Sequence, residues 1–462
     1  MRLPESVRQI LTVVASKMQQ RKARLYVVPI ILLVFVLWVH WRLSQIGRLG
    51  FEEKTLWDWL DLLLMPVILL WGGWFLTLSV QDIQHRAAVE QRRETSLLAY
   101  FDRMTDLLLR ENLRSAPETA DVRRVARART LATLSPLDAF RRGQVLLFLA
   151  ESGLISTPPL VNLTGALLQG SQLAEAELQG TDLTRVQMET AVLHHADLRK
   201  ANMWAINLRQ ADLQEADLSH ASLRVADLSG SVLAGANLNN VDLVGAQLVN
   251  VDGRGLNAVK ANLWGANAPN ANFSKASFYH ARLRGTKLNQ TILREATLIN
   301  AELVKAQGKA VDFVDAQLTG ANLQQAQLPE ANFRCANIGG ARLVNANLEK
   351  ARLWGVKAVG ANFRHANLQQ AILRVADLRR AYLREAQLQD ANLQVANLQR
   401  ATLTDADLRG ADLREADLRE AVLRGADLSG ANLRNAQVTS EQLAEAKSLH
   451  NAIMPDGKRY EG

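Results

Sequence analysis

The chain has 462 residues and one cysteine, Cys335, which excludes an intrachain disulfide and favours a reducing compartment. Lysine and arginine exceed aspartate and glutamate by 8, and 6 of that excess lie in the first 160 residues. The rest of the chain is close to neutral, so it cannot present the electrostatic potential of a phosphate backbone. This balance disfavours a chain that works by imitating DNA, and we expect no nucleic-acid partner.

The amino-terminal third contains two apolar stretches that are long enough to cross a bilayer. We expect a basic cytoplasmic segment at 1–24, followed by two transmembrane helices at about 25–43 and 60–80. Six of the nine tryptophans lie in or beside these stretches, as is typical of side chains at a membrane–water boundary. A signal peptide explains the first stretch less well, because no small-residue cleavage site follows it. A buried soluble helix is the alternative for the second, which Asp61 and Pro66 mildly favour.

Basic residues indicate the orientation of the two predicted spans. Six lysines and arginines precede the first span and several arginines follow the second, whereas the short connection has Arg42, Arg48 and Lys54. This bias predicts an integral membrane protein with both termini and the later part of the chain in the cytoplasm. The lipid bilayer is therefore the first partner that the sequence predicts.

Residues 81–157 read as a helical connector that ends in a cap. A charged helix follows the second span, and its apolar seam consists of Leu97, Phe101, Met104 and Leu108. The seam is short for a coiled coil. Packing against helices expected near 120–134 and 137–154 competes with self-association into a homo-oligomer through residues 81–114. Two prolines, at 158 and 159, end the helical region.

From Val161 to Ser440 the chain repeats a five-residue pattern in one phase. The central position of each unit is most often Leu, and the position two residues before it is most often Ala. Neither an α-helix nor a β-strand keeps a period of five on one face, so the pattern predicts a repeat architecture. A backbone that turns a corner every five residues closes a square coil of 20, which gives about 14 coils over 280 residues. Gly253 and Gly308 interrupt the pattern, but larger residues at neighbouring small positions conserve the volume.

The repeat resembles the pentapeptide repeat family, whose consensus matches Ala196-Asp197-Leu198 and most later units. The resemblance implies a mainly β fold, a right-handed quadrilateral β-helix, over residues 158–440. Some members of that family interact with DNA gyrase by imitating DNA, and the charge balance disfavours this alternative here. Residues 441–462 then form a capping helix, which starts at Thr439 or Ser440, and a loose tail.

The repeat itself explains most of the carboxylates that could otherwise be candidates for catalysis or metal binding. Aspartates precede many central positions, where a short polar side chain satisfies backbone groups at a corner. The sequence contains no Cys-His cluster, no Gly-rich phosphate loop before a helix and no Gly-x-Ser-x-Gly elbow. We therefore expect no enzyme, no cofactor and no metal site.

Outward positions remain as candidates for function. The position after each centre is expected to project from a flat side, where residues 20 apart stack in a column. One column contains Val244, Trp264 and Val304 among basic residues, and the preceding side contributes Val259, Tyr279 and Ile299, so Val259 and Trp264 are expected to be neighbours across a corner. Such an apolar cluster is a candidate protein-partner site, although single outward apolar residues are common. A second column, rich in arginine from Arg254 to Arg434, reads more simply as a solvated face. The candidate partner-binding residues are Val244, Val259, Trp264, Tyr279, Ile299 and Val304.

These observations favour a non-enzymatic, membrane-anchored scaffold that presents a rigid rod to an unknown protein partner. The alternative from another class is an accessory or regulatory subunit of a membrane transport system. Polar residues inside the spans would distinguish the two, and only Asp61 approaches that description.

Overall fold

The computed structural model describes the backbone of residues 56–461 and the side chains of residues 69–461. The predicted basic segment at 1–24 and the predicted span at 25–43 lie outside the described residues. The described helices are α3 (Leu56–Leu109), α4 (Asp121–Leu134), α5 (Ala139–Glu151) and α6 (Ser440–Ala444). The chain divides into two compact units, Met1–Thr95 and Ser96–Gly462, so α3 begins in the first unit and ends in the second.

Helix α3 is one continuous element of 54 residues, where the sequence predicts a span at 60–80 and a separate charged helix after it. Its exposed apolar side chains include Leu70, Leu76 and Ile83. Over the stretch that the structure describes, no helix is both long enough and apolar enough to cross a membrane.

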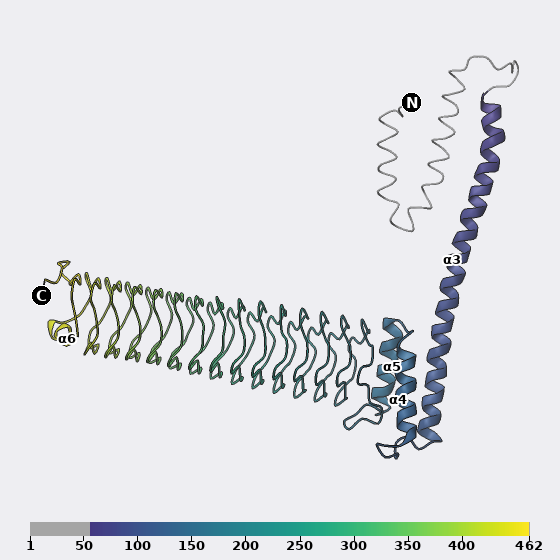
Figure 1. The fold of residues 1–462 in the computed structure, drawn as a ribbon, viewed down its shortest axis with the longest axis horizontal. Helices are drawn as coiled ribbons and strands as arrows, with labels where there is room; N and C mark the ends of the chain where they lie inside the picture. Colours follow the sequence, from purple (N-terminus) through teal and green to yellow (C-terminus); the bar gives the residue numbers. More distant parts are fainter. Residues whose placement is uncertain (1–55, 462) are drawn as a thin grey trace. The chain divides into compact units, whose positions relative to one another are not determined.

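The repeat region forms a square solenoid, drawn in Figure 1 as a stack of coils between α5 and α6. Each side contributes one residue to a parallel bridge with the residue 20 positions later, as between Asn262 and Arg282. Within the described residues these bridges remain isolated, because each side is too short for a continuous strand. The predicted β-solenoid with a 20-residue coil is confirmed, and its sides are single bridges.

A tight turn at each corner explains why the period is five. The amide of Ala266 donates to the carbonyl oxygen of Leu263 at 3.0 Å, and the second turn residue, Gly265, has φ +65°. A positive φ at this position is the signature of a type II turn. The residue before the centre secures the corner, because Asp217 Oδ1 accepts the amide of Ser219 at 2.8 Å. The role predicted for these aspartates is confirmed.

The interior is filled by the central and small residues, nearly all of which are buried. The two glycine exceptions are compensated as the sequence predicts. A Cβ at Gly253 would lie 2.6 Å from atoms of Leu256 and Phe273, and one at Gly308 would lie 2.6 Å from Val311. These neighbours therefore occupy the space that a central leucine would fill.

Three helices close the amino-terminal end of the solenoid. The end of α3 buries Leu97 and Met104 in a cluster with α4, α5 and the first coils, and Phe101 and Leu108 pack against it. Tyr100 Oη and Thr130 Oγ1 share a buried hydrogen bond of 2.9 Å, and burial raises the pKa of Tyr100. The apolar seam that suggested self-association thus packs within its own chain.

Helix α5 lies directly against the first coil. A Cβ at Gly143 would come 2.5 Å from the carbonyl oxygen of Gln172, so only glycine permits this approach. After α5, Ser156 pairs antiparallel with Thr181, and this bridge connects the cap to the open backbone edge of the solenoid. Covered edges protect a solenoid from association with other chains.

The carboxyl-terminal end is closed by α6 and by the segment that follows it. Thr439 caps α6 in a capping box with Gln442, and the side-chain amide of Gln442 also donates to the carbonyl oxygens of Leu418 and Ala421, both at 2.7 Å. Leu443 is buried under the helix. Helix α6 therefore satisfies backbone acceptors of the last regular coil as well as covering its core.

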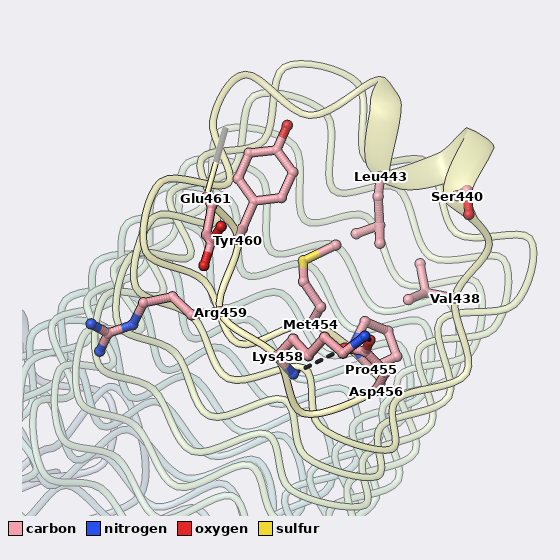
Figure 2. A pocket seen from close by; sticks show the side chains of 10 residues that line it. All are labelled: Val438, Ser440, Leu443, Met454, Pro455, Asp456, Lys458, Arg459, Tyr460 and Glu461. Atoms are coloured by element: carbon pink, nitrogen blue, oxygen red, sulfur yellow. Dashed lines mark hydrogen bonds and ion pairs between the residues drawn. The ribbon is translucent and has the colours of Figure 1, made fainter.

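The chain after α6 continues the coil instead of forming a loose tail. Asn432 pairs with Ile453, a spacing of 21 residues in place of 20, because α6 inserts one residue. Ile453 then pairs antiparallel with Arg459. In Figure 2 this segment and α6 surround a hollow of about 770 Å³, with Leu443 and Met454 inside and Tyr460 toward its edge.

Candidate partner-binding surface

The six candidate residues lie on two corners that flank one side of the solenoid. Val259, Tyr279 and Ile299 stack on one corner, at the first turn residue of successive coils. The other corner carries Val244, Trp264 and Val304 in the same turn position. The sequence predicts flat sides for these residues, with Val259 and Trp264 as neighbours across a corner. The structure instead places both of them at corners, with the side that contains Asn262 between them.

Backbone hydrogen bonds between coils hold both corners in register. On the first corner the amide of Lys260 donates to the carbonyl oxygen of Tyr279 at 2.9 Å. On the second the amide of Gly265 donates to the carbonyl oxygen of Arg284, also at 2.9 Å. The side chains on these corners therefore project from a rigid framework, with little backbone entropy left to lose on binding.

Two aromatic side chains provide the most exposed apolar area of the group. Trp264 is 58% exposed and Tyr279 is 38% exposed, whereas the four aliphatic residues are half-buried. The His280 ring contacts Tyr279 edge to face at 4.3 Å between centroids. We call the six residues Val244, Val259, Trp264, Tyr279, Ile299 and Val304 the Trp264 surface.

The side between the two corners has a polar floor. Parallel bridges join Asp242 to Asn262, Asn262 to Arg282, and Arg282 to Glu302, so these four side chains form one column. Arg284 stands between Trp264 and Val304 on the second corner and interrupts the apolar column there. The Trp264 surface therefore consists of two apolar corners, called the apolar rims, with the charged polar floor between them.

Three of the six arginines in the column from Arg254 to Arg434 have a carboxylate partner within the chain. Arg254 pairs with Asp252 at 2.7 Å, Arg294 with Asp312 at 2.5 Å, and Arg414 with Asp412 at 2.7 Å. The Arg334 guanidinium lies over the Trp354 ring, 5.4 Å from its centroid. This pairing supports the interpretation of the column as a solvated face.

The carboxylates with shifted pKa values belong to such pairs. A hydrogen bond from Arg419 lowers the pKa of Asp417 to about 2, and a hydrogen bond from Arg199 lowers the pKa of Asp197. Both carboxylates also accept the amide of that arginine, so they secure a corner. In the described part of the chain, no three His, Cys, Asp or Glu side chains are grouped so that they could hold a metal ion.

Two hollows of the described structure lie away from the Trp264 surface. One is the carboxyl-terminal hollow of Figure 2, where Lys458 pairs with Asp456 at 3.6 Å. A shallow groove on another side is lined by Arg294, Asp312, Arg352 and Ile372, among others. Neither of these two hollows includes a residue of the Trp264 surface.

A second apolar cluster was not predicted from the sequence. Trp354, Val375 and Val395 are between 40% and 48% exposed at one corner, and Ile372, 40% exposed, lies on the side next to it. The signal was present, because Val375 and Val395 are 20 residues apart and share a column. Trp354 belongs to the neighbouring arginine-rich column, which was interpreted from its arginines alone.

The structure thus defines a class of protein, a β-solenoid with square coils of 20 residues that is capped at both ends. Within that class the chain belongs to the pentapeptide repeat family. The model of that family, pentapeptide repeats, matches in eight copies at 161–194, 191–230, 216–252, 259–295, 276–307, 312–349, 359–394 and 396–435. These copies cover more than half of the chain, and they confirm the resemblance seen in the sequence.

Three similar solved structures are also repeat proteins. HetL, a pentapeptide repeat protein involved in heterocyst differentiation regulation from the cyanobacterium Nostoc, is 25% identical over 69% of this chain and 98% of its own, with a TM-score of 0.18. QnrB1, a plasmid-mediated fluoroquinolone resistance protein, is 16% identical over 38% of this chain and 88% of its own, with a TM-score of 0.24.

A pentapeptide repeat protein from the cyanobacterium Cyanothece is 30% identical over 25% of this chain and 89% of its own, with a TM-score of 0.11. No curated protein matched the sequence.

Proposed function

We propose that this protein is a non-enzymatic, membrane-anchored scaffold that recruits a protein partner through the Trp264 surface. The observation that carries the proposal is the exposure of Trp264, at 58%, on one corner and of Tyr279, at 38%, on the other, each in a column with aliphatic residues. Large aromatic side chains on a rigid framework are the usual anchors of protein–protein binding. The pentapeptide solenoid supplies the rigid framework.

The anchoring part of the proposal rests on the amino-terminal third. The sequence there contains the two apolar stretches, and α3 exposes Leu69 at 71%, Leu70 at 74% and Leu76 at 63%. Apolar side chains at this density on one helix suit a lipid or protein environment better than water. The distribution of lysine and arginine orients both termini and the solenoid toward the cytoplasm.

Comparison of the full chain with residues 81–462 tests the anchor, since the shorter chain lacks both apolar stretches. We expect the full chain in the membrane fraction after washing at high salt and at alkaline pH, and the shorter chain in the supernatant. Recovery of both chains in the same fraction would refute the anchor.

The double substitution Trp264→Glu with Ile299→Glu tests the surface. It introduces two charges into the apolar rims, and we expect recovery of membrane-tethered partners with the full chain to fall at least tenfold. The control Trp354→Glu with Val375→Glu alters the second apolar cluster by the same chemistry. Circular dichroism and thermal unfolding establish that each variant is folded. Unchanged recovery with Trp264→Glu and Ile299→Glu would exclude the surface as the site.

A further inference from the structure

Charge is segregated along the solenoid, although the solenoid as a whole is nearly neutral. Residues 161–250 contain 5 lysines and arginines against 10 aspartates and glutamates. Residues 251–310 contain 9 against 3, and residues 311–440 contain 16 against 14. The positive excess is therefore concentrated in the three coils that carry Val259, Trp264, Tyr279, Ile299 and Val304.

Where an aspartate precedes the central residue of a unit and an arginine follows it, the two side chains form an ion pair. The distances between these side chains are 2.6 Å for Arg199 and Asp197, 2.7 Å for Arg379 and Asp377, and 2.6 Å for Arg409 and Asp407. The sequence Arg282-Leu283-Arg284 breaks this arrangement, because an arginine stands where the pairing aspartate would be. Arg284 therefore lacks the local carboxylate that these arginines use, as do Arg364 and Arg424, whose units have Asn362 and Val422 in the place of the aspartate.

Four cations surround the apolar rims without an ion pair in the described structure. They are Lys260, which follows Val259; Arg282 on the polar floor; Arg284, which follows Trp264 by one coil; and Lys305, which follows Val304. All four are exposed. The same side carries two acidic residues, the exposed Glu302 and, one coil before Asn262, Asp242, which pairs with Arg224 at 3.0 Å. The Trp264 surface thus combines apolar rims with cations whose charge the chain leaves uncompensated.

We propose that the partner segment recognised here is an acidic polypeptide that carries apolar side chains between its carboxylates. This inference rests on the proposed function and specifies the chemistry of the partner. Carboxylates would pair with the four cations, and the apolar side chains would contact Trp264 and Tyr279. Complementary charge steers association and selects among partners, while the aromatic contacts supply affinity.

The arrangement fits a polypeptide better than a nucleic acid. The cations span three coils, which at roughly 4.8 Å per coil is about 10 to 15 Å along the rod. A strand of nucleic acid takes much of its affinity from a basic groove that tracks its backbone, and Glu302 interrupts such a groove here. The half-buried Val259, Ile299 and Val304 also offer contacts that suit aliphatic side chains.

Three defined probes test the inference with the full-length chain in detergent. The first is a labelled peptide of 12 alternating glutamates and leucines, the second replaces each glutamate by glutamine, and the third is a thymidine oligonucleotide of 12 nucleotides. Binding is measured by fluorescence anisotropy at two salt concentrations. We expect the glutamate peptide to bind at least tenfold more tightly than either other probe, and to weaken as salt rises, because salt screens exposed charges.

The double substitution Arg282→Glu with Arg284→Glu should weaken binding of the glutamate peptide at least tenfold. The control Arg364→Glu with Arg424→Glu changes the same number of charges at exposed positions that share the column of Arg284. It should alter binding less than twofold. Equal effects of the two double variants would overturn the inference, because binding would then follow net charge alone.

Other outcomes are distinguishable. If both peptides bind equally, and Trp264→Glu with Ile299→Glu abolishes binding, the proposed function stands and its acidic specificity is wrong. If the oligonucleotide binds most tightly and depends on Arg282 and Arg284, the partner class is nucleic acid and the inference is overturned. Absence of binding by all three probes would also overturn it, while loss of membrane-tethered partners in the Trp264→Glu and Ile299→Glu variant would keep the proposed function.

Discussion

At one central position of the repeat, Gly253, neighbouring side chains fill the space that a leucine occupies in most units. Position 253 lacks a side chain, and Leu256 stands at a small position that is usually alanine. Leu256 and Phe273 approach the empty side of Gly253 so closely that a Cβ would lie 2.6 Å from both. Gly253 and Leu256 therefore compensate each other, because the leucine at the small position fills the volume that a central leucine occupies in other units.

This exchange makes a consensus substitution destabilising. We expect Gly253→Leu, although it restores the commonest residue of the repeat, to lower the free energy of unfolding by roughly 1–3 kcal/mol, the usual cost of overpacking. The double variant Gly253→Leu with Leu256→Ala restores the regular arrangement of leucine and alanine and should recover most of that loss. Thermal and urea unfolding of the original protein, the two single variants and the double variant form a double-mutant cycle that measures the coupling of the two positions. A stabilising effect of Gly253→Leu alone would contradict the packing described here.

At the scale of single residues, the sequence predicted which side chains face the interior but not how outward side chains pair. The compensation at Gly253 and the corner role of the aspartates were both predictable, because each depends only on the five-residue period. Pairs such as Arg409 with Asp407 were not predicted. They depend on the turn that brings two outward side chains of one unit to the same side of the corner.

At the scale of elements, the two ends of the solenoid differ in how well the sequence predicted them. The start of α6 was predictable from Thr439, a residue that favours the amino-terminal cap of a helix. The coil that follows was missed because α6 shifts the phase of the repeat by one residue. Ala452 and Met454 keep the two-residue spacing between a small residue and a central residue, and this spacing could have indicated the coil.

Gln442 connects α6 to the last regular coil, and its removal should loosen that end of the protein. Gln442→Ala deletes two side-chain hydrogen bonds, to the carbonyl oxygens of Leu418 and Ala421. The oxygen of Leu418 keeps the amide of Ala421, but the oxygen of Ala421 loses its partner, at a cost of roughly 1–3 kcal/mol. We expect faster hydrogen exchange at the amides of Lys447 and Ile453, which bond to the preceding coil.

Gln437→Ala is the matched control, because Gln437 is exposed and its side chain makes no hydrogen bond within the described structure. Exchange at the amides of Lys447 and Ile453 should be unchanged in this variant. Equal exchange rates in both variants would show that the interaction of Gln442 does not hold the cap.

At the scale of the whole molecule, function depends on outward positions that the repeat leaves unconstrained. The sequence predicted that residues 20 apart share a column, and the stacking of Val259, Tyr279 and Ile299 follows that rule. It did not predict that these residues occupy a corner, because the position of the turn within the five-residue unit is a property of the backbone. Net charge over the whole solenoid also concealed the basic character of residues 251–310.

Site-specific photo-crosslinking tests most directly whether a partner contacts the Trp264 surface. The photoreactive residue p-benzoylphenylalanine replaces Val259 in one full-length protein and Val359 in another, two positions of the same column that lie five coils apart. Irradiation in intact membranes should produce a covalent partner adduct from position 259 and little or none from position 359. Adducts of equal yield at both positions, or an adduct from position 359 alone, would contradict the assignment of the partner site to the Trp264 surface.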